Sequence, residues 1–235
     1  MAGHSKWSKI KRDKGANDAK RGAIFTKLGN QIALAARAGA DPDMNPALAL
    51  AIDKAKSANM PNANIERSIA RVADKNAKTL EEVTYEGMGP GGIGLMIEVA
   101  TDNKNRTLPE IKTALIKNGG RLADAGSVAF QFSRKGVIVV DGADEATLLA
   151  ILESDAEDAK EDDGETIVYT NAKDLMKVRD NLKASGLGIK DAELAYVPNT
   201  LVQISDDEIV SKCMKLLDVL DDLSDVVNIH TNAEL

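Results

Sequence analysis

Residues 136–141 read GVIVVD, an apolar run rich in β-branched side chains that predicts a buried strand. The run is followed by a predicted helix that carries Leu148, Leu149 and Leu152. Two further strands then flank Asp163-Gly164, a dipeptide typical of tight hairpin turns. The stretch therefore begins with the order strand, helix, strand, strand.

A second helix and a fourth strand complete this pattern. Asn171 is placed to cap the helix, which ends near Gly186, and residues 191–197 form the strand. The order β-α-β-β-α-β is that of the ferredoxin-like fold. We therefore expect residues 136–202 to form a ferredoxin-like α/β domain, which is also acidic.

The segments on either side of this domain are incomplete by themselves. Residues 81–135 supply an apolar strand at 93–100, a helix, and an alternating strand at 127–132, with nothing to follow. Residues 203–235 supply one helix and one strand, which cannot bury their apolar faces alone. The two segments are therefore expected to complete one discontinuous central α/β domain, into which the ferredoxin-like domain is inserted.

The chain before residue 81 follows a helical period. Residues 17–75 predict three helices, with Asn45 placed to cap the second and Asn59-Met60-Pro61 breaking the chain before the third. Residues 1–16 have almost no apolar periodicity and are interpreted as an arm. The predicted fold is therefore α+β: an arm and three-helix domain over residues 1–80, followed by two ferredoxin-like α/β domains, one inserted in the other.

Composition excludes several classes of protein. The chain has 235 residues, of which 43% are apolar, which is enough for packed cores. One Cys and two His cannot supply a disulfide framework or a Cys/His zinc site. No apolar run approaches the roughly 18 residues of a membrane span, and the N-terminus lacks the apolar segment of a secretory signal. We expect no metal, no cofactor, no membrane partner and a cytoplasmic location.

The net charge of −7 hides a gradient along the chain. Residues 1–80 contain 15 Lys and Arg against 7 Asp and Glu, whereas residues 141–235 contain 8 against 23. A basic end on an acidic body favours a polyanionic partner at that end only. Lys and Arg neutralise phosphates and release counterions, so nucleic acid is the predicted ligand, and charge alone does not distinguish RNA from DNA.

The basic residues are concentrated in the arm and the first helix. A free Trp7 could stack on a base, and the alternative is a solvated basic tail with Trp7 folded back as an anchor. The predicted nucleic-acid-binding residues of this region are Lys6, Trp7, Lys9, Lys11, Arg12, Lys14, Lys20, Arg21 and Lys27.

Two loops are further candidates. Gly89, Pro90, Gly91 and Gly92 belong to a glycine-rich loop that precedes a strand rather than a helix and lacks a GK[ST] ending, so it is not a nucleotide-binding loop. It is either a hairpin bend or a loop that reaches a bound partner. Arg106 stands at a predicted helix start, where a cation opposes the helix dipole; an anionic partner or a salt bridge to Glu110 accounts for it equally well.

Catalytic chemistry has little support. Residues 153–165 contain eight acidic side chains in 13, but they bracket a hairpin turn and are expected to be solvated rather than to bind a metal. No nucleophile lies beside a base and an orienting group. The expected class is therefore a binding protein and not an enzyme.

Several long motifs occur in one order: AGHSKWSKIK (2–11), AIDKAKSANMPNANIERSI (51–69), YEGMGPGG (85–92), TDNKNRT (101–107) and GSVAFQFSRKGVI (126–138). Together they resemble the YebC/PmpR family. The resemblance implies three domains and a cytoplasmic, non-enzymatic regulator of gene expression, and it adds Asn59 and Met60 to the candidate nucleic-acid-binding residues.

The resemblance leaves two functions open. One is a ribosome-associated translation factor that contacts rRNA and tRNA and relieves stalling at proline-rich stretches, because bacterial members of the family are described in this way and mitochondrial members are translational activators. The other is a transcriptional regulator on duplex DNA, the family's older description. The third helix has Asn64, Arg67 and Arg71 but no clear helix-turn-helix spacing, which favours the ribosome. The oligomeric state does not follow from the sequence.

Overall fold

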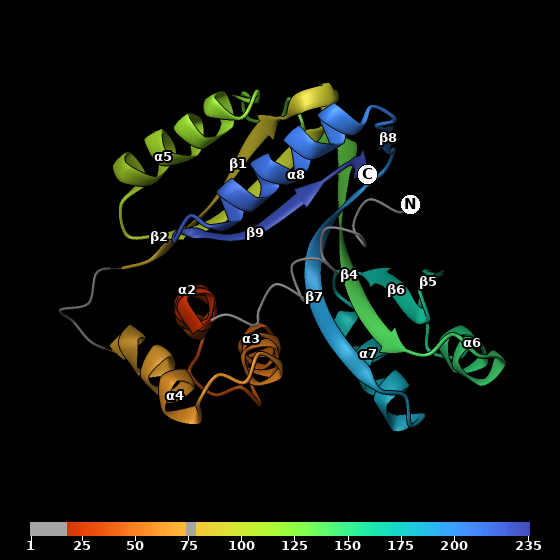
Figure 1. The fold of residues 1–235 in the computed structure, drawn as a ribbon. Helices are drawn as coiled ribbons and strands as arrows, with labels where there is room; N and C mark the ends of the chain where they lie inside the picture. The colour runs from red at the N-terminus through yellow and green to blue at the C-terminus, as the bar shows by residue number, and fades with distance from the viewer. Residues whose placement is uncertain (1–17, 74–78) are drawn as a thin grey trace. The chain divides into compact units, whose positions relative to one another are not determined.

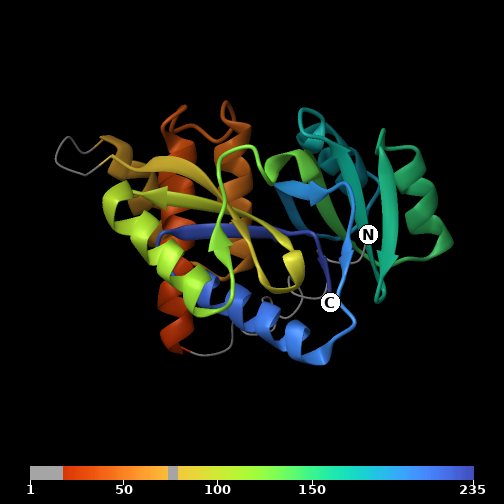
Figure 2. The same cartoon turned by 90° about the horizontal axis from the view of Figure 1, so that it is seen from above.

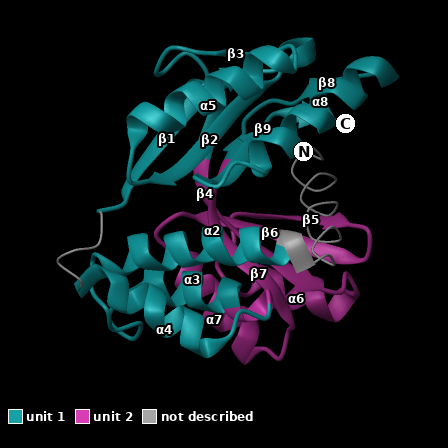
Figure 3. Cartoon of the chain, turned by 60° about the vertical axis from the view of Figure 1, so that its left-hand side comes forward, with its two compact units in different colours: residues 1–55, 59–133, 197–235 teal, residues 56–58, 134–196 magenta. Residues whose placement is uncertain are grey.

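The structure is a computed structural model that describes residues 18–73 and 79–235, with side chains from residue 21 onward. The described chain divides into two compact units (Figure 3). The first contains the chain up to residue 55, residues 59–133 and residues 197–235, and the second contains residues 56–58 and 134–196. Helices and antiparallel sheets occur together, so the predicted α+β class is confirmed.

Three helices open the first unit. They are α2 (Asp18–Ala36), α3 (Pro46–Ser57) and α4 (Asn62–Ala70), and a short 3-10 turn, η2 (Arg71–Ala73), follows. The side chain of Asn45 accepts a hydrogen bond from the backbone N–H of Leu48, as expected of a cap. The predicted break before the third helix is also confirmed, since Asn59 has the left-handed φ of 58°.

A four-stranded sheet forms the centre of the first unit. The strands β1 (Glu81–Met88), β2 (Gly94–Thr101), β3 (Arg121–Leu122) and β9 (Val226–Thr231) have the order β3-β1-β2-β9. Every neighbouring pair is antiparallel. Helices α5 (Lys104–Lys117) and α8 (Asp207–Asp221) lie side by side over one face (Figures 1 and 2). The apolar core lies between them and the sheet.

The opposite face of this sheet is also covered, because α2 contacts β2 and β9. The face contains a buried polar pair: Glu98 Oε2 lies 3.1 Å from His230 Nε2. The amide of Asn228 donates a second hydrogen bond to the same oxygen, at 3.0 Å. The continuous burial of β2 explains why its sequence is almost uniformly apolar.

Three details of the central domain differ from the sequence-based expectation. Strand β1 has no counterpart among the predicted strands, because it begins with the exposed Glu81 and Glu82 and the three residues that follow are only partly buried. With it, the chain order is β-β-α-β before the insertion and α-β after it, so the domain has the expected layers but not the order β-α-β-β-α-β. The predicted strand over residues 127–132 is wrong, since residues 129–131 form a 3-10 turn, η4 (Ala129–Gln131), and the strand begins at Phe132.

The second unit confirms the ferredoxin-like order. Its elements lie in the chain order β-α-β-β-α-β, and the sheet order is β5-β6-β4-β7. Asp174, not Asn171, stands at the start of the second helix. The elements are β4 (Phe132–Asp141), α6 (Glu145–Leu152), β5 (Asp158–Asp162), β6 (Glu165–Asn171), α7 (Leu175–Ala184) and β7 (Ile189–Pro198).

Helix α6 buries a different face from the one the leucines suggest. Thr147 and Ile151 are buried, whereas Leu148, Leu149 and Leu152 are exposed. The helix has only eight residues and is apolar almost all round, so its sequence does not determine which side faces inward. The remaining short strands, β8 (Val202–Gln203) and β10 (Ala233–Glu234), pair in parallel in the first unit.

Candidate nucleic-acid interface

The arm lies outside the described residues. The predicted contacts Lys6, Trp7, Lys9, Lys11, Arg12 and Lys14 fall within residues 1–17, and the side chain of Lys20 is not described either. Their role in nucleic-acid binding therefore stays a prediction. The structure describes the helix that follows them, α2, and shows how it is held.

Lys27 of α2 is buried and pairs with the end of another helix. Its Nζ donates to the backbone carbonyl of Asp221, the last residue of α8, and lies 3.2 Å from that residue's carboxylate. A cation at a helix C-terminus is favourable because the last carbonyls have no partners within the helix. Arg21, less than two turns earlier, is exposed. Lys27 thus fixes α2 to α8, and of these two cations Arg21 is the one at the surface.

In the turn between α3 and α4, one candidate nucleic-acid-binding residue is exposed and the other is buried. The side chain of Asn59 is exposed, whereas that of Met60 is buried. The backbone N–H of Met60 donates to the carbonyl of Ala55, which closes the end of α3. Met60 therefore holds the turn from inside, and Asn59 is the candidate that the turn exposes to solvent.

The α3–α4 connection has the length of a helix-turn-helix turn. Residues 58–61 join the two helices, and a four-residue connection is within the range found in helix-turn-helix motifs. The sequence alone shows no clear helix-turn-helix spacing. On α4, Arg67 is exposed beside the exposed Glu66. Arg71 donates to the side-chain oxygen of Asn30 at 3.0 Å, which ties the end of α4 to α2. The outer surface of α4 thus combines one cation with one acid.

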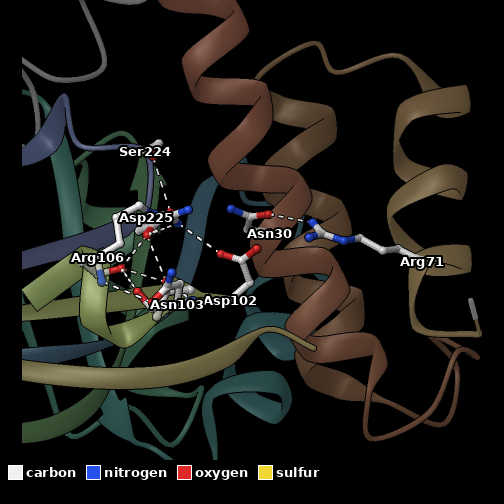
Figure 4. A network of polar contacts seen from close by, with 9 residues as sticks. Asn30, Arg71, Asp102, Asn103, Arg106, Ser224 and Asp225 are labelled. Atoms are coloured by element: carbon white, nitrogen blue, oxygen red, sulfur yellow. Dashed lines mark hydrogen bonds and ion pairs between the residues drawn. The ribbon is translucent and has the colours of Figure 1, made fainter. Parts of the chain in front are cut away.

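Arg106 is engaged by two carboxylates (Figure 4). Its guanidinium lies 2.7 Å from Asp225 Oδ2 and 3.1 Å from Asp102 Oδ1. The sequence left an anionic partner and a salt bridge to Glu110 as equal explanations, and the ion pairs that the structure shows are with Asp225 and Asp102 instead. The helix also begins earlier than expected, at Lys104, because the side chain of Asn103 caps it by accepting from the backbone N–H of Arg106.

Asp225 is the centre of this network. Its Oδ2 also accepts hydrogen bonds from the hydroxyls of Thr107 at 2.5 Å and Thr101 at 3.0 Å. Burial raises the pKa of Asp225, but the hydrogen bonds from Arg106, Thr107 and Thr101 outweigh burial and hold the pKa below its ordinary value. The arginine side chain remains 44% exposed, so a phosphate could still approach the guanidinium from solvent.

The glycine-rich loop is a packed hairpin bend. It joins β1 to β2 through a 3-10 turn, η3 (Pro90–Gly92), and the backbone N–H of Gly89 donates to the carbonyl of Ile93. Gly91 has φ +70°, and a Cβ there would lie 2.6 Å from the side chain of Ile204. Packing and backbone conformation therefore account for glycine at Gly91, while Gly91 and Gly92 themselves are exposed at the tip.

Glu86 organises a loop and is not among the residues that the sequence predicts to be functional. Its buried carboxylate accepts backbone N–H groups from Gly126, Val128 and Ala129 at 2.6 to 2.9 Å. Burial raises the pKa of Glu86, but these three hydrogen bonds outweigh burial and lower the pKa. The loop carries Phe130, whose side chain is exposed. One of the three glutamates of β1 gives no signal of such partners, because the donors are backbone groups at least 40 residues later.

Neither a metal site nor a membrane span is found in the described part of the chain. No group of three or more His, Cys, Asp or Glu side chains there could hold a metal ion. No helix among the described residues is both long and apolar enough to cross a bilayer.

Comparison with known proteins identifies the family. Residues 5–75 match the model of the TACO1/YebC protein N-terminal domain, and residues 80–233 match that of the TACO1/YebC second and third domain. A probable transcriptional regulatory protein of Persephonella marina is 46% identical over 241 residues, which cover all of this chain and 96% of the relative. One from Enterococcus faecalis is 45% identical and is covered to 99%.

A solved structure agrees with this assignment. The crystal structure of a conserved hypothetical protein from Aquifex aeolicus is 40% identical, with a TM-score of 0.86, and the match covers 92% of this chain and 91% of that one. The resemblance seen in the sequence motifs is therefore confirmed over nearly the whole length. The chain belongs to the TACO1/YebC family.

Proposed function

We propose that this protein is a non-enzymatic, nucleic-acid-binding regulator of gene expression that acts on the ribosome. In this function it contacts rRNA and tRNA through the basic arm and relieves stalling at proline-rich stretches. The observation that carries the proposal is the segregation of charge. Residues 1–17 contain five Lys and Arg and one Asp, whereas residues 141–235 have a large acidic excess. The acidic part would be repelled by the same polyanion and would orient the molecule on it.

The contacts of α2 hold in place the helix that follows the arm. Lys27 bonds to the C-terminal end of α8, and Arg71 bonds to Asn30 of α2. Residues 1–17 precede a helix anchored at both these points. When fully extended, about 15 residues reach roughly 50 Å, which is long enough to enter an RNA-lined channel while the helical domain stays outside.

A transcriptional regulator on duplex DNA is the second candidate. The relatives are named probable transcriptional regulatory proteins, and the α3–α4 connection has helix-turn-helix length. Against base reading by α4, its outer surface places Glu66 beside Arg67, and an exposed carboxylate is repelled by the phosphate backbone.

Binding of purified ribosomes and of duplex DNA separates the two candidates. We expect K9A/K11A to weaken ribosome binding strongly, whereas K112A/K117A, which removes two exposed lysines of α5, serves as the charge-matched control and leaves it unchanged. Arg67→Ala should have no effect on ribosome binding. Tight duplex binding that is lost in Arg67→Ala and retained in K9A/K11A would favour the transcriptional regulator instead.

A further inference from the structure

Helix α6 presents an apolar surface to solvent. The exposed fractions of Leu148, Leu149 and Leu152 are 41%, 58% and 81%. Side chains four positions apart lie on the same face of a helix, so Leu148 and Leu152 form one row with Leu149 beside it. Isolated exposed leucines are ordinary on protein surfaces, but three on one short helix form a contiguous patch, which typically marks an interaction site. These three side chains are the α6 leucine patch.

The surroundings of the α6 leucine patch are acidic. Residues 144–165 contain ten Asp and Glu and a single Lys. Asp155 is matched by Lys177 at 2.7 Å and Glu157 by Lys135 at 3.2 Å. Glu145 and Glu153, which bracket the leucines on α6 itself, have no cationic partner among the described residues and are exposed. The patch is therefore rimmed by negative charge that the unit does not neutralise.

This combination restricts what could cover the patch. Nucleic acid and an anionic lipid surface would both be repelled by the rim. A neutral apolar surface would bury the leucines but leave the carboxylates desolvated and unpaired, which is unfavourable. A partner with an apolar stripe flanked by Lys and Arg satisfies both features at once, and an amphipathic helix has that arrangement.

We propose that the α6 leucine patch and its acidic rim bind a basic amphipathic helix of a partner protein. The site uses residues other than the predicted contacts of the arm and goes beyond the proposed function. The protein then has two surfaces of opposite charge that select two kinds of partner, a polyanion at the basic end and a basic protein segment on the second unit.

The test uses a defined probe and the full-length chain. The probe is a fluorescein-labelled helical peptide of about 14 residues, or four turns, made of Leu and Lys with the leucines on one face. We expect fluorescence anisotropy to show binding that L148S/L149S/L152S weakens at least about tenfold. The matched controls are Met44→Ser and Phe130→Ser, which remove exposed apolar side chains elsewhere and should leave the affinity unchanged. A peptide with Glu in place of Lys should not bind.

Several results would overturn the proposal. Equal affinity of the triple variant and the unmodified protein would show that the leucines are not the site, and equal binding of the Glu peptide would remove the role of charge. Self-association that L148S/L149S/L152S abolishes in sedimentation would identify a second copy as the occupant. A shift in Trp7 emission in that variant would identify the chain's own arm. Should thermal melting show the triple variant unfolded, Leu152→Ser alone is used, and the same criteria apply to it.

Discussion

The two units of this protein have similar layers of helix and sheet but differ in the side chains that they expose to solvent. Each has a four-stranded sheet and two helices in its α/β part, yet in the first unit α5 and α8 cover one face of the sheet while α2 contacts the other. One of its cations, Lys27, is buried and pairs with Asp221. In the second unit, α6 turns three leucines outward among unneutralised acids. The first unit also has exposed apolar side chains, such as Met44 and Phe130, so the difference lies in the clustering of three exposed leucines on one helix of the second unit.

The largest expected effect is the difference in stability between a Leu→Ala substitution in the first unit and one in the second. Leu115→Ala, at a fully buried position of α5, should reduce the free energy of unfolding by about 2–5 kcal/mol because it creates a cavity in the core. Leu152→Ala on α6 should change it by no more than about 0.5 kcal/mol. Urea unfolding of both variants gives the comparison, and similar losses would contradict the difference between the two surfaces.

Removing the cation that anchors α2 should have the next largest effect. Lys27→Met keeps much of the side-chain volume but leaves the Asp221 carbonyl and carboxylate without their donor. We expect a loss of about 1–3 kcal/mol, since the carboxylate is 25% exposed and can be partly rehydrated. Lys112→Met, which removes an exposed cation of α5, is the control and should be nearly neutral. If the two variants unfold at the same denaturant concentration, Lys27 is not an anchor.

The Asp225 network should make the first unit sensitive to acid. Because the folded pKa of Asp225 lies below its unfolded value of about 3.9, the group adds stability above that value and loses it as the pH falls through the folded pKa. Asp225→Asn should therefore destabilise the protein at pH 7, by about 1–3 kcal/mol, and narrow the difference in stability between pH 7 and pH 3. Unfolding curves at both pH values check this. An unchanged pH difference in the variant would show that other carboxylates are responsible.

Much of the fold could be predicted from sequence because apolar periodicity reports burial directly. The strand at 136–141 and the ferredoxin-like order follow from such patterns, whereas the break at Asn59 follows from the Asn-Met-Pro sequence itself. Prediction failed where burial was partial or uniform. The half-exposed β1 showed no clear alternation, and α6 was apolar on every side.

The candidate site could be predicted less well, because its polar groups depend on partners distant in sequence. Arg106 pairs with Asp225 and Lys27 pairs with Asp221, and no feature of the neighbouring sequence indicates either pair. Both residues looked like surface cations in the sequence, and only the structure shows that their charges are already matched within the protein. The arm residues remain a prediction.

The smallest effect on stability should come from the arm. Deleting residues 2–15 should leave the melting temperature unchanged, since these residues have no apolar periodicity, while nucleic-acid binding is lost. In the intact protein, if about five arm cations meet phosphates of a single strand, log K against log salt concentration should have a slope of about −3 to −4. Thermal denaturation and a salt titration of ribosome binding measure the two effects. A large drop in melting temperature, or a slope near zero, would contradict this role.

The emission of Trp7 tests the central claim most directly, because it is the only tryptophan in the chain and reports on the arm alone. The ribosome-binding account predicts an exposed, quencher-accessible Trp7 in the free protein that becomes protected on adding ribosomes and not on adding duplex DNA. Trp7→Ala should then weaken ribosome binding by roughly 1–3 kcal/mol, as expected for a ring that stacks on a base. A blue-shifted Trp7 that is already protected in the free protein, or one protected by duplex DNA alone, would contradict the account.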